Sequence, residues 1–361
     1  MNVLFTVSGI IAIVVLLIDF LLIFLWRFNF KKYSRRSSYH PRISILVAAR
    51  NEEQNIEKCV HSLLHLNYPK DRYEILVGDD RSSDSTPEIL KTLSGTYKQV
   101  SVHFIHNNKG SARGKANVLA HLAEIATGEF YFITDADCIV GKDWIQSLLA
   151  AHEEGVGITI GTTGVASTFQ NMEWLLALGM LKVINDLGRP VTAMGNNMYI
   201  TREAYDSVGG YASIPFSITE DYELFKQVSR KDFATRHVVA PDGHVMTQPV
   251  ATLNQLMHQR KRWMNGAMQL PLPVVLLLLF QALYYPALVF TGLKIWWYGL
   301  SLLLLKSMVQ AFFILLVGRR VGSPVPFFQL ISFELYSGLV SVLTSVYYIL
   351  PFKIKWKGRK Y

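Results

Sequence analysis

The sequence predicts an α/β domain with a doubly wound, mostly parallel sheet, placed between apolar segments that can cross a membrane. Two patterns lead to this prediction. From Arg42 to about Thr134, short apolar runs alternate with helical stretches, as a parallel sheet covered by helices requires. Near both ends of the chain, the apolar residues instead form runs long enough to span a bilayer. Half of the 361 residues are hydrophobic, and they are distributed unevenly along the chain.

The first apolar segment runs from Val3 to Trp26 and contains a single charged residue, Asp19. At about 1.5 Å per helical residue, it can cross a hydrocarbon core of about 30 Å. No small-residue cleavage site follows, so we expect residues 1–27 to be a permanent transmembrane anchor rather than a cleaved signal peptide. The positive-inside rule predicts a cytosolic flank after it, because six basic residues follow: Arg27, Lys31, Lys32, Arg35, Arg36 and Arg42.

Composition narrows the possible partners and the compartment. The formal net charge is +9, but the basic residues cluster beside the apolar segments. We therefore expect contact with membrane lipids and no nucleic-acid partner. The two cysteines, Cys59 and Cys138, are too few for a disulfide scaffold and fit a reducing cytosol. Cys138 follows a pair of aspartates, where a small buried neighbour is favoured over a metal ligand.

Acidic residues follow two of the predicted strands. Asp79-Asp80 comes after the second strand, and Asp135-Ala-Asp137 comes after the fourth. Ligands of doubly wound sheets bind beyond the carboxyl ends of the strands, so we expect both groups to belong to a functional site. The predicted strands are residues 43–48, 73–77, 100–105 and 130–134, and the helices between them are residues 53–66, a stretch from about 86, and about 115–126.

The C-terminal part predicts further membrane contact. An amphipathic interfacial helix is expected at 251–270, transmembrane segments within 271–350, and a basic tail at 351–361. Three full crossings would put the tail outside, against the positive-inside rule. Either one segment is re-entrant or interfacial, or the tail breaks the rule. We expect a multi-pass integral membrane protein, in a bacterial plasma membrane, with its catalytic domain in the cytosol. The apolar segments are 271–290, 295–317 and 328–350.

Four short motifs together resemble the active site of membrane-bound family 2 glycosyltransferases of the cellulose, chitin and hyaluronan synthase type. The motifs are Asp79-Asp80, Asp135-Ala-Asp137, Thr219-Glu220-Asp221 and Gln259-Arg-Lys-Arg262-Trp263. The resemblance runs from about Pro41 to Gln269. It implies a glycosyltransferase A fold for a catalytic domain at 41–250, and transfer of a sugar from a nucleotide sugar to an acceptor.

Breaking the bond to a nucleoside diphosphate leaves negative charge that a carboxylate-bound divalent cation can neutralise. The resemblance implies that Asp137 binds Mg²⁺ or Mn²⁺, and that Asp135 lines the metal and nucleotide-sugar site. Two solvated acids in a turn are the alternative. Lys115 lies within the small-residue stretch 109–117, at the start of a predicted helix, where exposed N–H groups can bind a pyrophosphate.

The resemblance also implies which residues hold the nucleoside. Asp79 and Asp80 match acids that contact uracil and ribose, which implies a UDP-linked donor. Arg50 and Glu52 match a loop that touches the nucleoside. Glu52 can equally be an acid at a helix start, where the helix dipole favours it.

An inverting transfer needs a carboxylate that takes the proton of the attacking hydroxyl. The resemblance assigns this role to Asp221, beside Glu220 in the same motif. Acids at the start of a helix are the competing explanation. Asn196 and Asn197 match a position where the family contacts the acceptor.

The helix expected at 253–269 carries the last motif on one face and an apolar stripe on another. The resemblance implies that Trp263 stacks on the acceptor sugar, and that Gln259 and Arg262 approach the diphosphate. Arg260 falls within the stripe, so we expect it to reach lipid phosphate by snorkelling. The stripe consists of Leu253, Leu256, Met257, Met264, Ala267 and Met268.

The sequence leaves three acceptor types open: a lipid-linked acceptor, a short glycan and a polysaccharide. Channel-forming synthases of the family usually carry more membrane segments than the four found in this sequence, which favours lipid-linked or short-glycan transfer. A catalytically silent scaffold or sensor subunit of a glycan-synthesis complex is the alternative from another class.

Overall fold

The computed structural model describes residues 2–34, 39–356 and 359–360, so Arg35, Arg36 and Lys357 of the predicted basic segments lie outside the described residues. The chain forms two compact units. The sheet unit consists of Lys31–Ala166 and Gly188–Gln248. The helical unit consists of Met1–Phe30, Ser167–Leu187 and Pro249–Tyr361.

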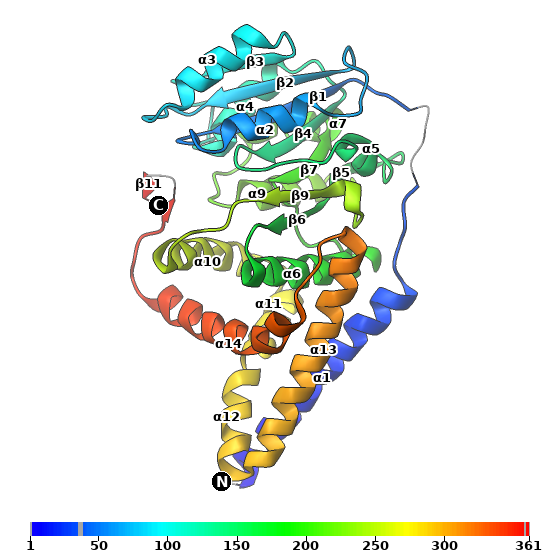
Figure 1. The fold of residues 1–361 in the computed structure, drawn as a ribbon, viewed down its shortest axis with the longest axis vertical. Coiled ribbons are helices and arrows are strands. Elements are labelled where there is room, and N and C mark those ends of the chain that lie inside the picture. Colours follow the sequence, from blue (N-terminus) through cyan, green and yellow to red (C-terminus); the bar gives the residue numbers. More distant parts are fainter. Residues whose placement is uncertain (1, 35–38, 357–358, 361) are drawn as a thin grey trace. The chain divides into compact units, whose positions relative to one another are not determined.

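The sheet unit is built on a seven-stranded mixed sheet with the order β3-β2-β1-β4-β7-β5-β8 (Figure 1). The first four strands are parallel, whereas β7 is antiparallel to both of its neighbours. This architecture confirms the predicted α/β fold class. The strands are β1 (Ile43–Ala49), β2 (Tyr73–Asp79), β3 (Val100–Phe104), β4 (Phe130–Asp135), β5 (Val156–Ile160), β7 (Asn197–Thr201) and β8 (Ala234–His237).

Helices cover the sheet because its central strands are apolar on both faces. Ile75 and Val77 of β2 join one buried core with α2 and α3, whereas Leu76 points to the other face by the alternation of strand side chains. The helices of this unit are α2 (Ile56–Leu64), α3 (Thr86–Thr96), α4 (Lys115–Ile125), α5 (Trp144–Leu149), α7 (Arg202–Ser207), α8 (Gly210–Ser213), α9 (Glu220–Ser229) and the short 3-10 helix η1 (Pro241–Gly243); a second, parallel pair of strands is β6 (Thr162–Val165) and β9 (His244–Thr247).

The strand register brings the two acidic groups to one edge of the sheet. Ala49 of β1 pairs with Asp79 of β2, and Ala48 of β1 pairs with Asp135 of β4. Because these strands are parallel, their carboxyl ends lie side by side, with the end of β1 between the two aspartates.

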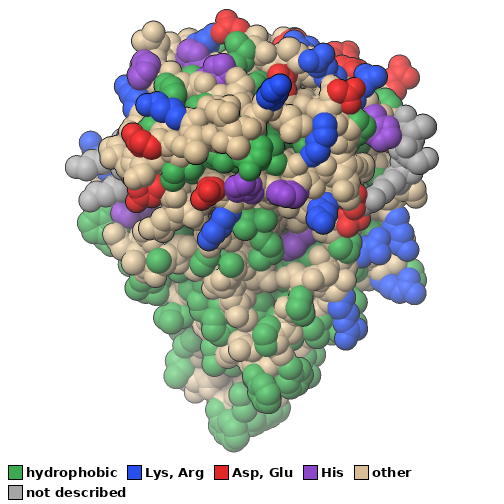
Figure 2. Space-filling view, turned by 45° about the horizontal axis from the view of Figure 1, so that its top comes forward, with side chains coloured by type: hydrophobic (Ala, Val, Ile, Leu, Met, Phe, Trp, Pro, Cys, Tyr) green, Lys and Arg blue, Asp and Glu red, His purple; other side chains and the backbone are tan. Residues whose placement is uncertain are grey.

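The helical unit contains four candidate membrane spans, judged by length and composition: Val3–Phe28, Leu272–Lys294, Trp296–Val321 and Phe327–Ile349. Figure 2 shows many hydrophobic side chains over the part of these helices that faces the viewer. The helices are α1 (Asn2–Phe28), α6 (Thr168–Asp186), α10 (Leu253–Ala267), α11 (Leu272–Ala282), α12 (Tyr284–Lys294), α13 (Trp296–Val321) and α14 (Phe327–Ile349), and two short strands follow, β10 (Lys355–Trp356) and β11 (Arg359–Lys360).

The structure differs from the expected boundaries of the C-terminal helices at three places. The helix of the second span continues past residue 290 to Lys294. The second span is interrupted at Leu283, because Pro286 lacks the N–H that would bond to the Ala282 carbonyl. The third helix continues past residue 317 to Val321 and ends where Gly322 adopts a left-handed conformation with φ 71°. In addition, α6 lies within the predicted catalytic segment 41–250 but belongs to the helical unit.

The last helix takes a different direction from the other spans. Figure 1 shows α14 lying across the direction of α12 and α13. Its far end is tied to α10, because Lys261 donates hydrogen bonds to the carbonyl oxygens of Leu350 (2.5 Å) and Tyr347 (3.3 Å). A cation is favourable at the C-terminal carbonyls of a helix, so this lysine acts as a cap for α14.

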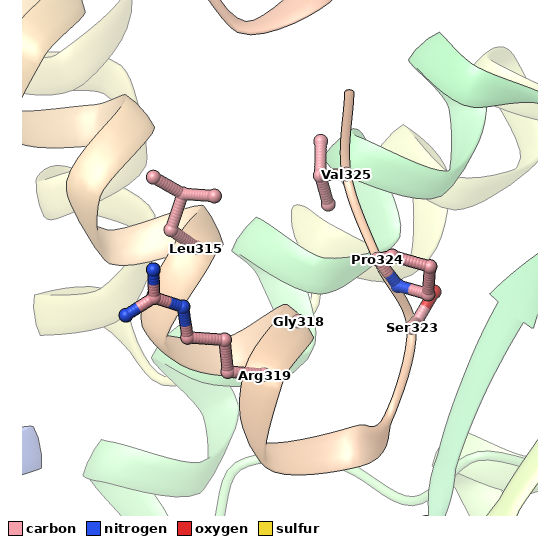
Figure 3. Close-up of a pocket in the computed structure, with 6 residues that line it drawn as sticks. All are labelled: Leu315, Gly318, Arg319, Ser323, Pro324 and Val325. Carbon is pink, nitrogen blue, oxygen red and sulfur yellow. The ribbon is translucent and has the colours of Figure 1, made fainter. Parts of the chain in front are cut away.

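A cavity of about 230 Å³ lies where α13 turns into the connection to α14 (Figure 3). Arg319 is its single charged lining residue, and Ser323 donates from its backbone N–H to the Gly318 carbonyl at 2.9 Å. The lining contains none of the predicted site residues: Leu315, Gly318, Arg319, Ser323, Pro324 and Val325.

Candidate active site

The ammonium group of Lys115 lies between two acidic residues of the predicted site, Asp135 and Glu220. This residue begins α4, and its Nζ forms an ion pair with Asp135 at the end of β4. The same Nζ lies 3.4 Å from Oε1 of Glu220 and donates a hydrogen bond to the Gly195 carbonyl at 2.8 Å. Burial opposes the charge, but the carboxylates of Asp135 and Glu220 raise the pKa of Lys115 above its usual value. Lys115 therefore carries a positive charge among these acids.

Asp221 occupies the first turn of α9 and joins the same group of residues. Its Oδ2 accepts from the Gly195 N–H at 2.8 Å, and its Oδ1 accepts from the Tyr222 N–H at 2.8 Å. A Cβ on residue 195 would lie 3.0 Å from the Asp221 Cβ and 3.2 Å from the Lys115 Nζ, so glycine is needed for this close approach. The two backbone donors fix the orientation of the Asp221 carboxylate.

Asp79 and Asp80 are buried at the end of β2 and are held by neighbouring loops. Asp79 accepts from the Ser82 hydroxyl at 2.5 Å and from the Ser82 N–H at 3.1 Å. Arg50 donates to the Asp80 carbonyl at 2.7 Å and lies 4.0 Å from the Asp80 carboxylate. The structure thus brings Arg50, Asp79 and Asp80 together at the edge of the sheet where Asp135 also lies.

Glu52 is buried next to these residues. Its carboxylate accepts from the side-chain amide of Asn55, the residue before α2, at 3.0 Å, and its N–H donates to Thr86 at 2.8 Å. These contacts fit the alternative interpretation of Glu52 as an acid at a helix start.

Asp137 follows β4 by two residues and is partly exposed. Among the described residues, no group of three or more His, Cys, Asp or Glu side chains could hold a metal ion. Mg²⁺, however, is commonly bound by one or two carboxylates together with substrate phosphates. Asp135 and Asp137 therefore fit a divalent cation whose other ligands come from a diphosphate.

Cys138 is buried beside Asp137, and its Sγ donates to Oδ1 of Asp137 at 3.8 Å. Burial and the charges of Asp137 and Asp135 raise its pKa well above the usual value, so the thiol stays protonated. This burial fits the expected role of a small buried neighbour.

The two asparagines of the predicted acceptor loop have different environments. The Asn196 amide oxygen accepts from Thr163 at 3.2 Å, and the residue is partly exposed. Asn197 is fully buried: its amide accepts from Trp144 at 2.8 Å and donates to the carbonyls of Thr162 (2.7 Å) and Gly243 (2.9 Å). The acceptor-binding prediction does not fit Asn197, because its amide groups are all used within the fold.

Gln259, Arg262 and Trp263 lie on α10. This helix begins with a capping box formed by Thr252 and Gln255. This helix belongs to the helical unit, whereas the other predicted site residues belong to the sheet unit. Within the sheet unit, the structure brings the donor-site and base residues together.

The prediction that Arg260 reaches lipid phosphate is wrong. Its guanidinium forms an ion pair with Glu173 of α6, and both side chains are largely buried. The apolar stripe around it is also covered in part, because Leu256 and Met257 pack with Val340 of α14. The charge of Arg260 is thus matched within the protein, which removes the need for a lipid partner.

Sequence reasoning gave no role to Tyr211, a buried tyrosine of α8 that packs on Tyr205. Its hydroxyl is buried and, within the described residues, has no hydrogen-bond partner. Burial, and the charges of Glu220 and Asp221, raise the pKa of this hydroxyl well above its usual value. The Gly-Gly pair before it hinted at an unusual backbone, but no pattern linked it to the acids.

We expect the free energy of unfolding to depend on pH because of His244 in β9. Its Nδ1 lies 3.1 Å from the Thr162 hydroxyl, and burial lowers its pKa from 6.5 to about 4. The unfolded chain binds a proton below about pH 6.5, and the folded chain does not until about pH 4. The free energy of unfolding should therefore fall by up to about 3 kcal/mol as the pH drops through this window.

Denaturant unfolding of the purified protein between pH 4 and 8 measures this effect. His244→Gln should flatten the pH dependence, whereas His106→Gln, at an exposed histidine, should leave it unchanged. An unaltered slope in the His244 variant would refute the assignment.

The sequence model of the family described as Glycosyl transferase family 2 matches residues 44–222. Residues 44–222 therefore form a glycosyltransferase family 2 domain. The matched range begins in β1 and ends in the first turn of α9, so it contains the aspartates at the sheet edge, Lys115 and Asp221. This match confirms the resemblance drawn from the motifs.

Two curated relatives indicate the range of products in the family. The β-monoglucosyldiacylglycerol synthase of Trichormus variabilis is 31% identical over 237 residues, covering 63% of this chain and 49% of the relative. The poly-β-1,6-N-acetyl-D-glucosamine synthase of Staphylococcus aureus is 25% identical over 232 residues, covering 62% and 54%. This chain spans about half the length of these curated relatives.

The mannosyltransferase PcManGT of Pyrobaculum calidifontis has a similar structure, solved in complex with GDP-Man and Mn²⁺. The TM-score is 0.58 at 17% identity, and the alignment covers 94% of this chain and 99% of that one. This likeness confirms the glycosyltransferase A fold.

Proposed function

We propose that this protein transfers a sugar from a UDP-linked donor to a hydroxyl group of a membrane lipid, with inversion at the anomeric carbon. The observation that carries sugar transfer is the convergence of Asp135, Glu220 and Asp221 around Lys115. Such a group can bind a charged diphosphate at one side and accept a proton at the other. A catalytically silent scaffold would have no use for these acids, none of which is lost.

On the donor side, we expect Arg50, Asp79 and Asp80 to hold the nucleoside, and Lys115 to move from Asp135 to the donor diphosphate. Asp135 and Asp137 would hold Mg²⁺ or Mn²⁺. When bound, the cation neutralises charge that develops on the departing diphosphate. The Mn²⁺ found with PcManGT supports divalent metal use in this fold.

On the acceptor side, Asp221 is the proposed general base. Asp221 takes the proton of the acceptor hydroxyl as two bonds change. The acceptor oxygen bonds to the anomeric carbon, and the bond between that carbon and the diphosphate oxygen breaks. The nucleoside diphosphate leaves with the electron pair. Because two backbone N–H groups orient the carboxylate, little reorganisation is needed when the hydroxyl arrives.

A lipid acceptor is favoured by the apolar helical unit and by the relative whose product is a monoglucosyl diacylglycerol. We propose that Trp263 contacts the acceptor headgroup, and that Gln259 and Arg262 approach the diphosphate. The relative that makes a polysaccharide supports a polymer product as the second candidate.

We also propose that the sheet unit lies in the cytosol. Two helices end in basic residues: α1 in Arg27, and α13 in Arg319 and Arg320. These helices contact each other, because the Trp26 ring of α1 packs on the Phe313 ring of α13 with centroids 5.5 Å apart. The positive-inside rule assigns that end to the cytosol, and the sheet unit follows α1 directly in the chain. An interfacial α14 would then keep the basic tail on the same side.

Nucleoside diphosphate release from the purified protein in phosphatidylglycerol vesicles containing dioleoylglycerol tests the proposal. We expect one UDP-sugar of a panel that also includes GDP-mannose to support release, and its labelled sugar to enter the lipid extract. Label in a polymer would favour the second candidate. No release with any donor, in the presence of Mn²⁺, would favour the silent scaffold.

Removal of divalent metal should stop the reaction. Excess EDTA is expected to lower nucleoside diphosphate release to background, and added Mn²⁺ or Mg²⁺ should restore it. Full activity after chelation, verified by metal analysis of the sample, would contradict the role of Asp135 and Asp137 as ligands.

A further inference from the structure

The Trp263 ring makes two contacts, one directly with a residue of α6 and one with an arginine that is paired with a residue of α6. The Arg260 guanidinium lies over the Trp263 ring, 4.4 Å from its centroid. The Trp174 ring stands nearly perpendicular to it, with centroids 5.3 Å apart and an interplanar angle of 81°. Residues 173 and 174 are adjacent on α6, so one helix supplies Trp174 directly and reaches Arg260 through Glu173.

Glu173 is fixed in turn from a third helix. Its Oε2 pairs with Arg260 and also accepts from the Tyr336 hydroxyl of α14 at 3.2 Å. The Tyr336 ring stacks on Phe169 of α6, with centroids 4.7 Å apart and an angle of 18°. Arg260 and Glu173 are 11% and 17% exposed, so solvent screens their attraction only in part.

We propose that Glu173 and Arg260 are positioning residues that fix the indole ring of Trp263 for the acceptor headgroup. This inference rests on the proposed function of Trp263 as an acceptor contact. The cation–π interaction between a guanidinium and an indole stabilises the position of the ring. The ion pair with a carboxylate keeps the guanidinium over the ring. A headgroup that meets a misplaced ring enters the transfer geometry less often, because small displacements have large effects on reacting groups.

Single substitutions give the first test. Glu173→Gln and Arg260→Met are expected to raise the KM for dioleoylglycerol in phosphatidylglycerol vesicles about tenfold, with the KM of the donor unchanged. Arg260→Lys should recover part of the loss, because an ammonium still lies over the ring. An unchanged acceptor KM in both single variants would overturn the proposal.

The charge-swapped variant E173R/R260E separates positioning from simple stabilisation. It restores the ion pair between α6 and α10, so the thermal midpoint should return toward that of the unaltered protein. It also places a carboxylate where the cation met the indole, so the acceptor KM should stay high. Recovery of the acceptor KM together with stability would show that the pair serves the fold alone.

A measurement without any acceptor keeps this test independent of the proposed function. The seven tryptophans can be labelled with fluorotryptophan, and the Trp263 fluorine resonance is assigned from its loss in Trp263→Phe. We expect one sharp Trp263 resonance in the unaltered protein, and a broadened or divided one in Glu173→Gln and E173R/R260E. A sharp, unshifted resonance in these variants overturns the positioning role, whereas absence of transfer by the unaltered protein contradicts the proposed function instead.

Discussion

Replacing Asp221 by asparagine is expected to reduce sugar transfer by about a thousandfold, within the range by which a positioned general base accelerates a reaction. Asparagine keeps the size of the side chain but cannot accept the proton of the attacking hydroxyl. The asparagine side chain has one acceptor oxygen where the aspartate has two, so it cannot accept hydrogen bonds from the N–H groups of both Gly195 and Tyr222. Transfer of labelled sugar under saturating donor and acceptor measures the loss in kcat.

Glu223→Gln provides a matched control on the same helix. Glu223 is a second acid of α9, more buried than Asp221, and its carboxylate bonds to Lys226 and Gln227 within the helix. We expect this variant to retain transfer within about twofold, and both variants to bind the free nucleoside diphosphate with unchanged affinity. An Asp221→Asn protein that binds donor and still transfers sugar at a rate near normal would exclude Asp221 as the base.

The sequence was sufficient for four of the seven strands of the sheet and for one edge of the candidate site. Strands β1, β2 and β4 are short apolar runs, β2 and β4 end at aspartates, and parallel pairing then brings Asp79 and Asp135 to the same edge. This prediction needed only the direction of the strands. Asp80 was found for the same reason and Lys115 from its place at the start of a predicted helix, whereas Arg50 came from the family resemblance.

The contacts that depend on distant segments were not predicted. Arg260 looked like a lipid-facing cation because its helix was considered alone, and its partner Glu173 lies 87 residues away on α6. Asn197 looked like a ligand-binding amide in a loop, yet it begins β7 and its side chain bonds to Trp144 and two buried carbonyls. Periodicity reports which face of an element is apolar, but it does not report which other element covers that face.

The membrane helices contain an ion pair whose rupture should cost much of the stability of the helical unit. Lys306 of α13 donates to Oδ2 of Asp19 on α1 at 2.9 Å, and Gln281 of α11 donates to Oδ1 at 3.4 Å. The Lys306 ammonium also lies over the Tyr284 ring, 4.9 Å from its centroid. The Lys306 and Asp19 side chains are 5% and 13% exposed, so water and salt can replace a lost partner only in part.

Lys306→Met should therefore lower the free energy of unfolding by about 3–5 kcal/mol, because it leaves the Asp19 carboxylate buried without its cation. Methionine retains most of the volume, so the lost charge, not a cavity, causes the effect. The double variant Asp19→Asn, Lys306→Met removes both charges and should regain most of the loss. Leu304→Met, on the exposed side of the same helix, should stay within about 0.5 kcal/mol of the unaltered protein. Unfolding by SDS titration in mixed micelles measures all four proteins under one condition. If the single and double variants were equally destabilised, the helices would depend on the lysine stem and its packing on Tyr284, and the charge pair would contribute little.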